Sequence, residues 1–447
     1  MEEVDLATPV QKAIRLVSVA DLDVFDVYAT YVRTLSIDIF GKGIKEARSR
    51  TDFGIGIRAY KNKGLGVAFS QSLDPSDIET TVHQAVGFAR VAQPDPYFKG
   101  IPGPSEAPEV SNLCDREIAS LSLVKAGELA KRMIDGIEGV CSGAVYFGGV
   151  SASHSRSYLM TSTGVHVETE KTFISASIAP TYRREDDVGS SYEYDYATSL
   201  AEINFDEIGR GAAEKALEQF GSKRVESGSL PIILSPDSAG SLITSLMVAI
   251  SGEAAVKERT FASGCLGKQV APEILEVMDD GTIDGAIASS AYDGEGVPRK
   301  PIKVIGKGTI LTFLHNSYSA GIASVETTGH AWRAGYRGPV GAGPTNIRVT
   351  PGDSSLDEMV AETKKGILAT DAGFHPNFVS GDFSSTIDEG FLIEGGEKKH
   401  PVKNLMAGGH ILELFSNIEL ISREGRTIGK GHFFPAIKIS QIRLAGK

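Results

Sequence analysis

The pattern of hydrophobic and polar positions predicts that the first part of the chain begins with a helix, several strands and a second helix. Helical spacing at residues 8–19 precedes β-branched and aromatic runs at 23–40 and 44–70, and a helix over 74–92 follows. The run at 44–70 is expected to hold two or three strands, with turns near Thr51-Asp52 and at Asn62–Gly64.

The same order then returns, with a helix at 121–137, strands across 143–180 and a helix at 205–221. Five prolines within residues 94–108 separate the two occurrences and indicate a linker. We therefore predict an α+β protein with N-terminal helix–strands–helix modules. The expected boundaries are 1–93 for the first module, 94–116 for the linker and 117–225 for the second module.

Beyond residue 229 the pattern changes, which indicates a β-rich α+β C-terminal domain over 229–447. Short strand-like runs at 308–316, 345–352 and 390–404 alternate with glycine-rich turns. One further helix is predicted at 355–367, with Ser354 or Ser355 near its cap.

The segment from 235 to 252 predicts a helix with an unusual ridge of small residues. Ser235 is a favourable N-cap, and Pro236 suits the first helical position. Helical spacing separates a broad apolar face from a narrow stripe formed by Ser238, Ser241, Ser245, Ala249 and Gly252. Such a stripe suits the close approach of a neighbouring strand or helix, or the lining of a site.

Composition and charge restrict the function. The formal net charge is −12 and no Lys/Arg-rich run occurs, which disfavours direct binding to nucleic acid. No apolar run is long enough for a membrane span, and the first residues lack a secretory signal, so a cytoplasmic protein is expected. Cys114, Cys141 and Cys265 are expected to be reduced and to act as buried fillers rather than ligands.

No local sequence motif indicates a catalytic site: G-x-S-x-G, the P-loop, G-x-G-x-x-G, C-x-x-C and H-E-x-x-H are all absent. Polar residues on glycine-rich C-terminal loops are candidates for contacts with a peptide or a partner. They are Asp293, Glu295, Arg299, His330, Arg333 and Asn346. Turn geometry alone also favours such residues, and a cation–π contact between Arg333 and Trp332 would be a structural reason for that pair.

These segments resemble the TldD/PmbA family, described as modulators of DNA gyrase or zinc-dependent proteases, over nearly the whole chain. The resemblance rests on their order along the chain. The matching segments are Asp293-Gly-Glu295-Gly-Val-Pro, Thr328-Gly-His-Ala-Trp-Arg333, Pro344-Thr-Asn346, Ser380-Gly-Asp-Phe, Gly390-Phe-Leu-Ile-Glu394 and Pro401-Val402.

The resemblance also implies what this chain lacks. The TldD branch carries H-E-x-x-x-H and a distant cysteine as zinc ligands, and an ungapped match places Ile243, Thr244 and Val248 at the His, Glu and His positions. The cysteine is expected near 425–435, yet the last cysteine here is Cys265. The chain is therefore similar to the PmbA/TldE branch, which implies no metal or other cofactor in this chain and zinc in a catalytic partner.

Three functions stay open at this point. The resemblance favours a non-catalytic subunit of a TldD/TldE-type peptidase, paired with a TldD-like zinc-bearing subunit or a second copy of itself. Strand edges in its β-rich half would bind extended peptide. The first alternative is a self-sufficient hydrolase using Ser238, Ser241 and Ser245 or the pair Asp293 and Glu295. The second is a regulatory binding protein of the gyrase-modulator type.

Overall fold

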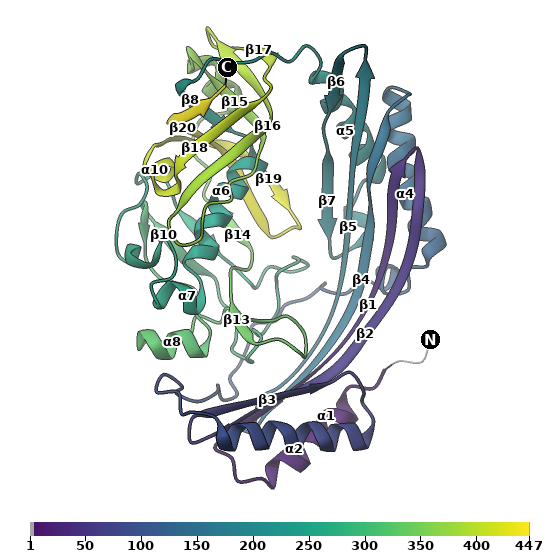
Figure 1. Cartoon of the computed structure of the whole chain (residues 1–447), viewed down its shortest axis with the longest axis vertical. Helices are drawn as coiled ribbons and strands as arrows, with labels where there is room; N and C mark the ends of the chain where they lie inside the picture. The colour runs from purple at the N-terminus through teal and green to yellow at the C-terminus, as the bar shows by residue number, and fades with distance from the viewer. Residues whose placement is uncertain (1–3, 447) are drawn as a thin grey trace.

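The computed structural model describes residues 4–446, and its N-terminal half is built on one seven-stranded antiparallel sheet (Figure 1). The strand order is β3-β2-β1-β4-β5-β6, with β7 also paired to β5. The strands are β1 (Val24–Gly41), β2 (Gly43–Lys61), β3 (Gly64–Ser70), β4 (Val145–Thr161), β5 (His166–Arg184), β6 (Asp187–Ser190) and β7 (Glu193–Ala197).

The two predicted modules share this sheet, because β1 pairs with β4 over their whole length, from Asp26–Thr161 to Gly41–Tyr146. The turn predicted near Thr51-Asp52 is wrong: β2 runs through it, with Thr51 opposite Arg33. The turn predicted at Asn62–Gly64 is confirmed, and Asn62 and Lys63 both have positive φ there.

The predicted helices of this half are confirmed with shifted ends, and they lie on one face of the sheet. The residues of β1 that pack under them alternate along the strand: Ala29 belongs to the lower cluster, and Leu35 and Ile37 to the upper one. The lower layer is α1 and α2, and the upper layer is α4 and α5. The helices are α1 (Ala7–Ser18), α2 (Pro75–Val91), α3 (Arg116–Ala119), α4 (Leu123–Val140) and α5 (Phe205–Glu218).

The C-terminal domain is built on an eleven-stranded mixed sheet, which confirms the predicted β-rich α+β class. Its strands are β8 (Gly228–Leu234), β9 (Val277–Asp279), β10 (Ile302–Gly306), β11 (Thr309–Ile310), β14 (Ile347–Val349), β15 (Lys365–Ala372), β16 (Asp382–Glu394), β17 (Glu397–Pro401), β18 (Leu405–His410), β19 (Ile418–Ile428) and β20 (His432–Ala445). β12 (Ala331–Arg333) and β13 (Val340–Ala342) form a separate pair.

The helices of this domain are short apart from α6, the helix predicted from the small-residue ridge. The set is α6 (Pro236–Ala249), α7 (Gly252–Val256), α8 (Ser317–Ala323), α9 (Leu356–Glu362) and α10 (Ile411–Ser416). Ser235 caps α6 as predicted, because its Oγ accepts from the Ser238 N–H. α9 has the predicted cap at Ser355 but ends at Glu362, because residues 365–372 form β15 between β8 and β16.

The C-terminal domain packs against the face of the N-terminal sheet opposite its helices (Figure 1). Two glycines of β2 make close contact possible where the loop between β12 and β13 meets the sheet. A Cβ at Gly56 would lie 2.0 Å from the Tyr336 carbonyl oxygen, and one at Gly54 would lie 2.5 Å from the Tyr336 ring. The alternating glycines of β2 therefore form the seat for this loop.

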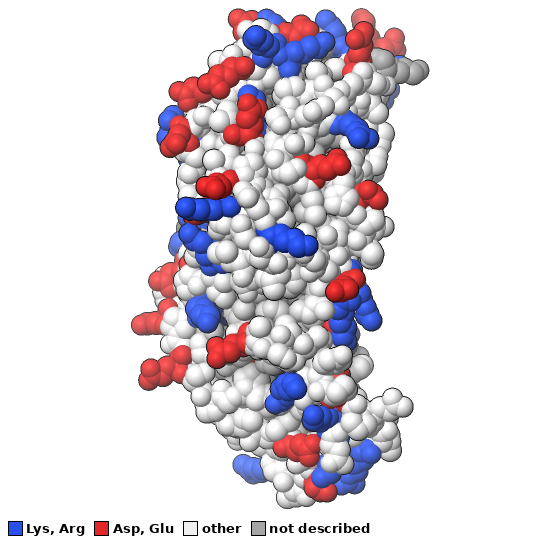
Figure 2. Space-filling model, turned by 90° about the vertical axis from the view of Figure 1, so that its left-hand side faces the viewer, with Lys and Arg blue, Asp and Glu red and all other residues white. Residues whose placement is uncertain are grey.

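Among the described residues, no helix is both long and apolar enough to cross a membrane. Figure 2 shows one side of the molecule, on which acidic and basic side chains are interspersed and the centre is largely uncharged. This face offers no broad basic surface for a phosphate backbone.

Candidate functional site

An open groove of about 600 Å³ lies between α6 and β7, where the C-terminal domain faces the N-terminal sheet. Its walls come from three places: the exposed side of α6, the tyrosines of β7 and the loop after β15. The lining side chains used below are Tyr192, Tyr194, Tyr196, Ser241, Thr244, Ser245, Val248, Asp371, Phe374 and His375.

Three tyrosines form one wall of the groove. Tyr194 and Tyr196 share one face of β7, and Tyr192 directly precedes the strand and continues the alternation. Tyr192, Tyr194 and Tyr196 stack in a row with ring centroids 5.9 and 6.0 Å apart. Tyr194 donates to Asp237 on α6 at 2.9 Å, and the Arg426 guanidinium lies 4.6 Å from the Tyr194 ring centroid. The row is thereby fixed to the first turn of α6.

The small-residue ridge of α6 serves both purposes that its sequence left open. Ser238 Oγ accepts from the Ala372 N–H at 2.9 Å and Ser241 Oγ accepts from the Phe374 N–H at 2.8 Å, so the ridge holds the end of β15 and the segment after it against the helix. Ser241 and Ser245 also line the groove. Among the described residues, none of the serines on this ridge is hydrogen-bonded to a histidine or a carboxylate.

The three positions matched to the zinc motif do not share one face of α6. Ile243 is 1% exposed and packs in the core, whereas Thr244 and Val248 line the groove, with Val248 44% exposed. A zinc ion needs about three nitrogen, sulfur or carboxylate donors close together. Within residues 4–446, the one group of three or more such side chains with converging donor atoms lies elsewhere in the molecule. The residues of this groove therefore do not fit a catalytic zinc ion.

Carboxyl groups with raised pKa values lie at the groove and in the cavity beside it. Burial, followed by the charge of Asp388, raises the pKa of Asp371, whose carboxylate accepts from the Tyr192 hydroxyl at 3.2 Å. Burial raises the pKa of Glu389 to about 7, and Asp371 contributes to that shift. The adjoining cavity, of about 240 Å³, is lined by both side chains and by Lys215.

The six residues singled out from the glycine-rich loops lie in a different place, and most are buried. Asp293 is 5% exposed, and its carboxylate accepts from the backbone N–H groups of Glu295, Val297 and Ala331. Burial and the neighbouring Glu295 raise the pKa of Asp293 to about 6. Glu295 is also 5% exposed and accepts from the Ser317 N–H at the start of α8.

Arg333 joins this loop to the N-terminal sheet through a buried ionic network. Asp26 on β1 accepts from both Arg58 (2.7 Å) and Arg333 (3.1 Å), and Arg58 also lies 3.6 Å from Glu295. The sequence left open a cation–π contact between Arg333 and Trp332, but the aromatic ring that faces the Arg333 guanidinium is that of Tyr28, with its centroid 4.8 Å away. Trp332 is 49% exposed.

His330, Asn346 and Arg299 also have internal partners. His330 Nε2 lies 3.0 Å from Asp279, and both side chains are buried. The Asn346 amide donates to the Asp280 carbonyl and to the Ser289 hydroxyl. Arg299 donates to Ser290 and, with Asp293 and Arg333, lines a second pocket of about 330 Å³ between the two domains. The contacts predicted for all six residues with a peptide or partner stay a prediction.

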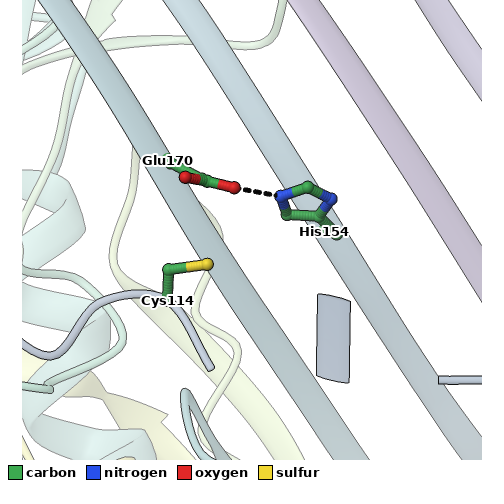
Figure 3. Close-up of side chains that lie close together, drawn as sticks. All are labelled: Cys114, His154 and Glu170. Atoms are coloured by element: carbon green, nitrogen blue, oxygen red, sulfur yellow. Dashed lines mark hydrogen bonds and ion pairs between the residues drawn. The ribbon is translucent and has the colours of Figure 1, made fainter. Parts of the chain in front are cut away.

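The cysteines are all free, as expected, but the prediction that they are buried fillers is wrong for Cys114, which is exposed. It lies beside His154 and Glu170 on the helix-covered face of the N-terminal sheet (Figure 3). The tyrosine row was missed in the sequence, although the alternation Tyr192, Tyr194, Tyr196 was a visible signal of one aromatic face.

The fold and the groove define a two-domain α+β protein in which a long antiparallel sheet and a β-rich domain meet around an open cleft. The chain belongs to the PmbA/TldD family: three models of PmbA/TldA metallopeptidase match in order. They are domain 1 at residues 25–89, the central domain at 116–220 and the C-terminal domain at 227–446.

Relatives support the same assignment over most of the chain. An uncharacterized protein of Methanocaldococcus jannaschii is 28% identical across 90% of this chain and 92% of its own length. Metalloprotease PmbA of Escherichia coli O157:H7 is 25% identical across 86% of this chain and 84% of its own length. TldE of Thermococcus kodakarensis shares the fold, with a TM-score of 0.86 and 23% identity over 98% of this chain and 99% of that one.

A protein of Thermotoga maritima named as a candidate modulator of a DNA gyrase also has this fold. Its TM-score is 0.88, with 22% identity over 99% of this chain and 100% of that one.

Proposed function

We propose that this chain is the non-catalytic subunit of a TldD/TldE-type cytoplasmic peptidase. It binds peptide in the groove along α6, and a zinc-bearing partner cleaves it. The partner is a TldD-like chain, with a second copy of this chain as the alternative. The names of the relatives support a peptidase-like family; the subunit role is our inference from the groove.

One observation carries the proposal. α6 presents Thr244 and Val248 to an open groove, at the positions matched to the glutamate and second histidine of the zinc motif. A valine offers no donor atom, and a threonine hydroxyl is neither a good zinc ligand nor a general base at neutral pH. The groove therefore lies where the zinc-bearing branch would have its active site, but Thr244 and Val248 supply neither a zinc ligand nor a general base.

The lining suits an extended peptide. Within the described chain, β7 pairs only with β5, so its other edge is free of strand partners. The Tyr194 and Tyr196 N–H groups and the Tyr194 carbonyl on that edge already bond to side chains of Glu193, Asp195 and Arg426. The stacked tyrosine rings would therefore contact an extended peptide, and they would do so without selecting one sequence. Asp371, which faces the groove, favours a basic group on the peptide at neutral pH.

A self-sufficient serine hydrolase is less well supported. Ser238 and Ser241 use their hydroxyl oxygens as acceptors for backbone N–H groups, and Ser245 donates to the Leu242 carbonyl of its own helix. A nucleophilic serine needs a base within hydrogen-bond reach. Asp293 and Glu295 are likewise engaged by backbone N–H groups.

Reconstitution tests the proposal. The chain is purified alone and mixed with a family member that carries H-E-x-x-x-H, and hydrolysis of a fluorogenic peptide library is followed. We expect hydrolysis by the mixture and none by this chain alone, and Thr244→Ala is expected to leave it unchanged. Val248→Arg fills the groove and is expected to lower the mixture's activity at least about tenfold, a change of ~1.4 kcal/mol.

Val91→Arg is the matched control, since Val91 is 80% exposed at the end of α2 and distant in the fold from the groove. An equal loss in both arginine variants would contradict peptide binding in the groove. Affinity capture separates the regulatory alternative: recovery of a topoisomerase without any H-E-x-x-x-H chain would replace the subunit role with gyrase modulation.

A further inference from the structure

A cluster of three metal-ligand side chains lies on the helix-covered face of the N-terminal sheet, on the opposite face from the second pocket. Cys114 comes from the segment between α2 and α3, His154 from β4 and Glu170 from β5. One donor atom of each lies within 4.8 Å of the others, and Figure 3 shows the imidazole directed toward the carboxylate, with the thiol beside them. His154 Nε2 and Glu170 Oε1 are 2.6 Å apart.

The strand register brings His154 and Glu170 together. His154 is opposite Thr172 and Arg156 is opposite Glu170, so His154 and Glu170 are diagonal neighbours on one face. Diagonal side chains of this length reach one another. Their position lies between the two helical layers, because Ala152 belongs to the upper core cluster and Tyr158 to the lower one.

Cys114 is held in place by backbone contacts on both sides of it. The Thr172 N–H donates to the Leu113 carbonyl at 3.0 Å, and the Asp115 N–H donates to Thr172 Oγ1 at 2.8 Å. The Asp115 carboxylate accepts in turn from the Ser199 hydroxyl and the Leu200 N–H, both at 2.8 Å. The thiol therefore belongs to an ordered segment along the edge of β5 and stays next to the imidazole and carboxylate.

We propose that Cys114, His154 and Glu170 form a binding site for zinc or a zinc-like divalent cation. The site has three protein ligands and a fourth position open to water. Thiolate, imidazole and carboxylate together suit zinc, whereas magnesium and calcium require oxygen ligands. Zinc bond lengths of about 2.0–2.3 Å place bound donors roughly 3–4 Å apart, so shifts of about 1 Å bring these side chains onto one ion.

Binding replaces the hydrogen bond between His154 and Glu170 by two bonds to the metal, and the thiol releases its proton to solvent as the metal–sulfur bond forms. Without metal the Cys114 thiol is a poor nucleophile, because partial loss of hydration and the Glu170 carboxylate raise its pKa to about 11. The bound ion would fasten the linker to β4 and β5. This proposal departs from the expectation of a metal-free chain, which was based on the α6 positions and on the missing C-terminal cysteine.

The test uses the full chain stripped of metal with a chelator and then dialysed. Zn²⁺ is titrated in competition with a chromogenic chelator, and Co²⁺ serves as a spectroscopic probe of thiolate ligation. We expect about one equivalent of bound zinc, a rise in melting temperature with zinc, and a sulfur-to-cobalt charge-transfer band. Cys114→Ser and Glu170→Gln are each expected to weaken zinc binding more than about 100-fold, with the band lost in Cys114→Ser.

Cys265→Ser and His83→Gln are the matched controls, and they are expected to bind zinc as the unmodified chain does. Glu170 is half exposed, so Glu170→Gln keeps the test informative if Cys114→Ser folds poorly. Absence of zinc uptake by the unmodified chain would overturn the proposal, as would equal uptake by Cys114→Ser and Cys265→Ser. The readout is metal binding by the isolated chain, so its failure is independent of the subunit role.

Discussion

Two of the places where the domains meet differ in what they contain. At one, Asp26, Arg58, Glu295 and Arg333 form a buried network in which every charge has a partner. At the other, α6 and the β7 tyrosines enclose an open groove whose wall includes uncharged side chains such as Thr244 and Val248. Two of the six residues singled out from the sequence, Glu295 and Arg333, lie in the network, and the larger open space lies in the groove.

This difference indicates that the D-G-E-G and H-A-W-R segments preserve the docking of the two domains. Asp293 organises its own loop through backbone N–H groups, Glu295 joins that loop to the start of α8, and Arg333 fastens it to β1. A buried carboxylate between two guanidinium groups is costly to disturb, whereas an exposed groove side chain is not. Substitutions in the network should therefore lower the free energy of unfolding much more than substitutions in the groove.

The largest loss of stability is expected from a substitution in the buried ionic network. Asp26→Asn removes the charge between Arg58 and Arg333, which leaves the buried Arg333 guanidinium without its ion-pair partner and Arg58 with Glu295 alone, so we expect a loss of about 3–5 kcal/mol in the free energy of unfolding. Urea denaturation followed by circular dichroism measures it. Asp52→Asn is the control, since its ion pair with Arg337 is partly exposed and should contribute less than about 1 kcal/mol. Equal losses would contradict the special role of the network.

A smaller, pH-dependent effect is expected at Glu389, in the cavity beside the groove. Its pKa is about 7 in the folded chain against 4.5 for an unperturbed group. The folded state therefore holds the proton more tightly, and the stability contributed by the neutral form is lost as the pH rises from 4.5 through 7.

Glu389→Gln should flatten this decline by on the order of 1–2 kcal/mol between pH 5 and pH 8. Thermal unfolding across that range measures the effect, and Glu394→Gln, at an exposed position of the same strand, is the control. A decline that persists unchanged in Glu389→Gln would assign it to another group.

The stability of the folded chain should depend more on Ser241 than on Ser245, although both line the groove. Ser241→Ala leaves the Phe374 N–H without its acceptor, and we expect a loss of about 1 kcal/mol in stability. Ser245→Ala removes only a bond to its own helix and should cost less than about 0.5 kcal/mol. Chemical denaturation of the two variants side by side distinguishes them, and a reversed order would contradict the docking role of the ridge.

The smallest change in stability and in activity is expected from a substitution at Thr244. Thr244→Val keeps the shape of the side chain on a partly exposed helix face, so unfolding should change by less than about 0.5 kcal/mol. Peptide hydrolysis by the reconstituted pair should also be unchanged, since we assign the hydroxyl no chemical role. Loss of hydrolysis in this variant would place a reacting group on α6.

Much of the fold was predictable because its signals are local. The cap at Ser235, the turn at Asn62–Gly64 and the helices flanking the sheet follow from neighbouring residues alone. The errors come from pairing at a distance. Thr51 stays in β2 because β1 continues opposite it, and residues 365–367 are strand because β8 and β16 lie on either side.

The candidate sites were less predictable for the same reason. Motif matching identified the position of α6, but only the packing shows that Thr244 faces a groove while Ile243 faces the core. Cys114, His154 and Glu170 are far apart in sequence and meet through the register of β4 with β5. Nothing in the local sequence of any one of them indicates the other two.

Hydrolysis of the peptide library by the isolated chain decides whether this subunit carries the chemistry. The measurement uses the Cys114→Ser background, so that a metal bound by Cys114, His154 and Glu170 cannot contribute. It is made with and without a chelator, and also with Thr244→Ala. We predict no hydrolysis above background in any of these samples, with activity appearing only when an H-E-x-x-x-H partner is added. Chelator-sensitive hydrolysis by the isolated chain that Thr244→Ala abolishes would contradict the account.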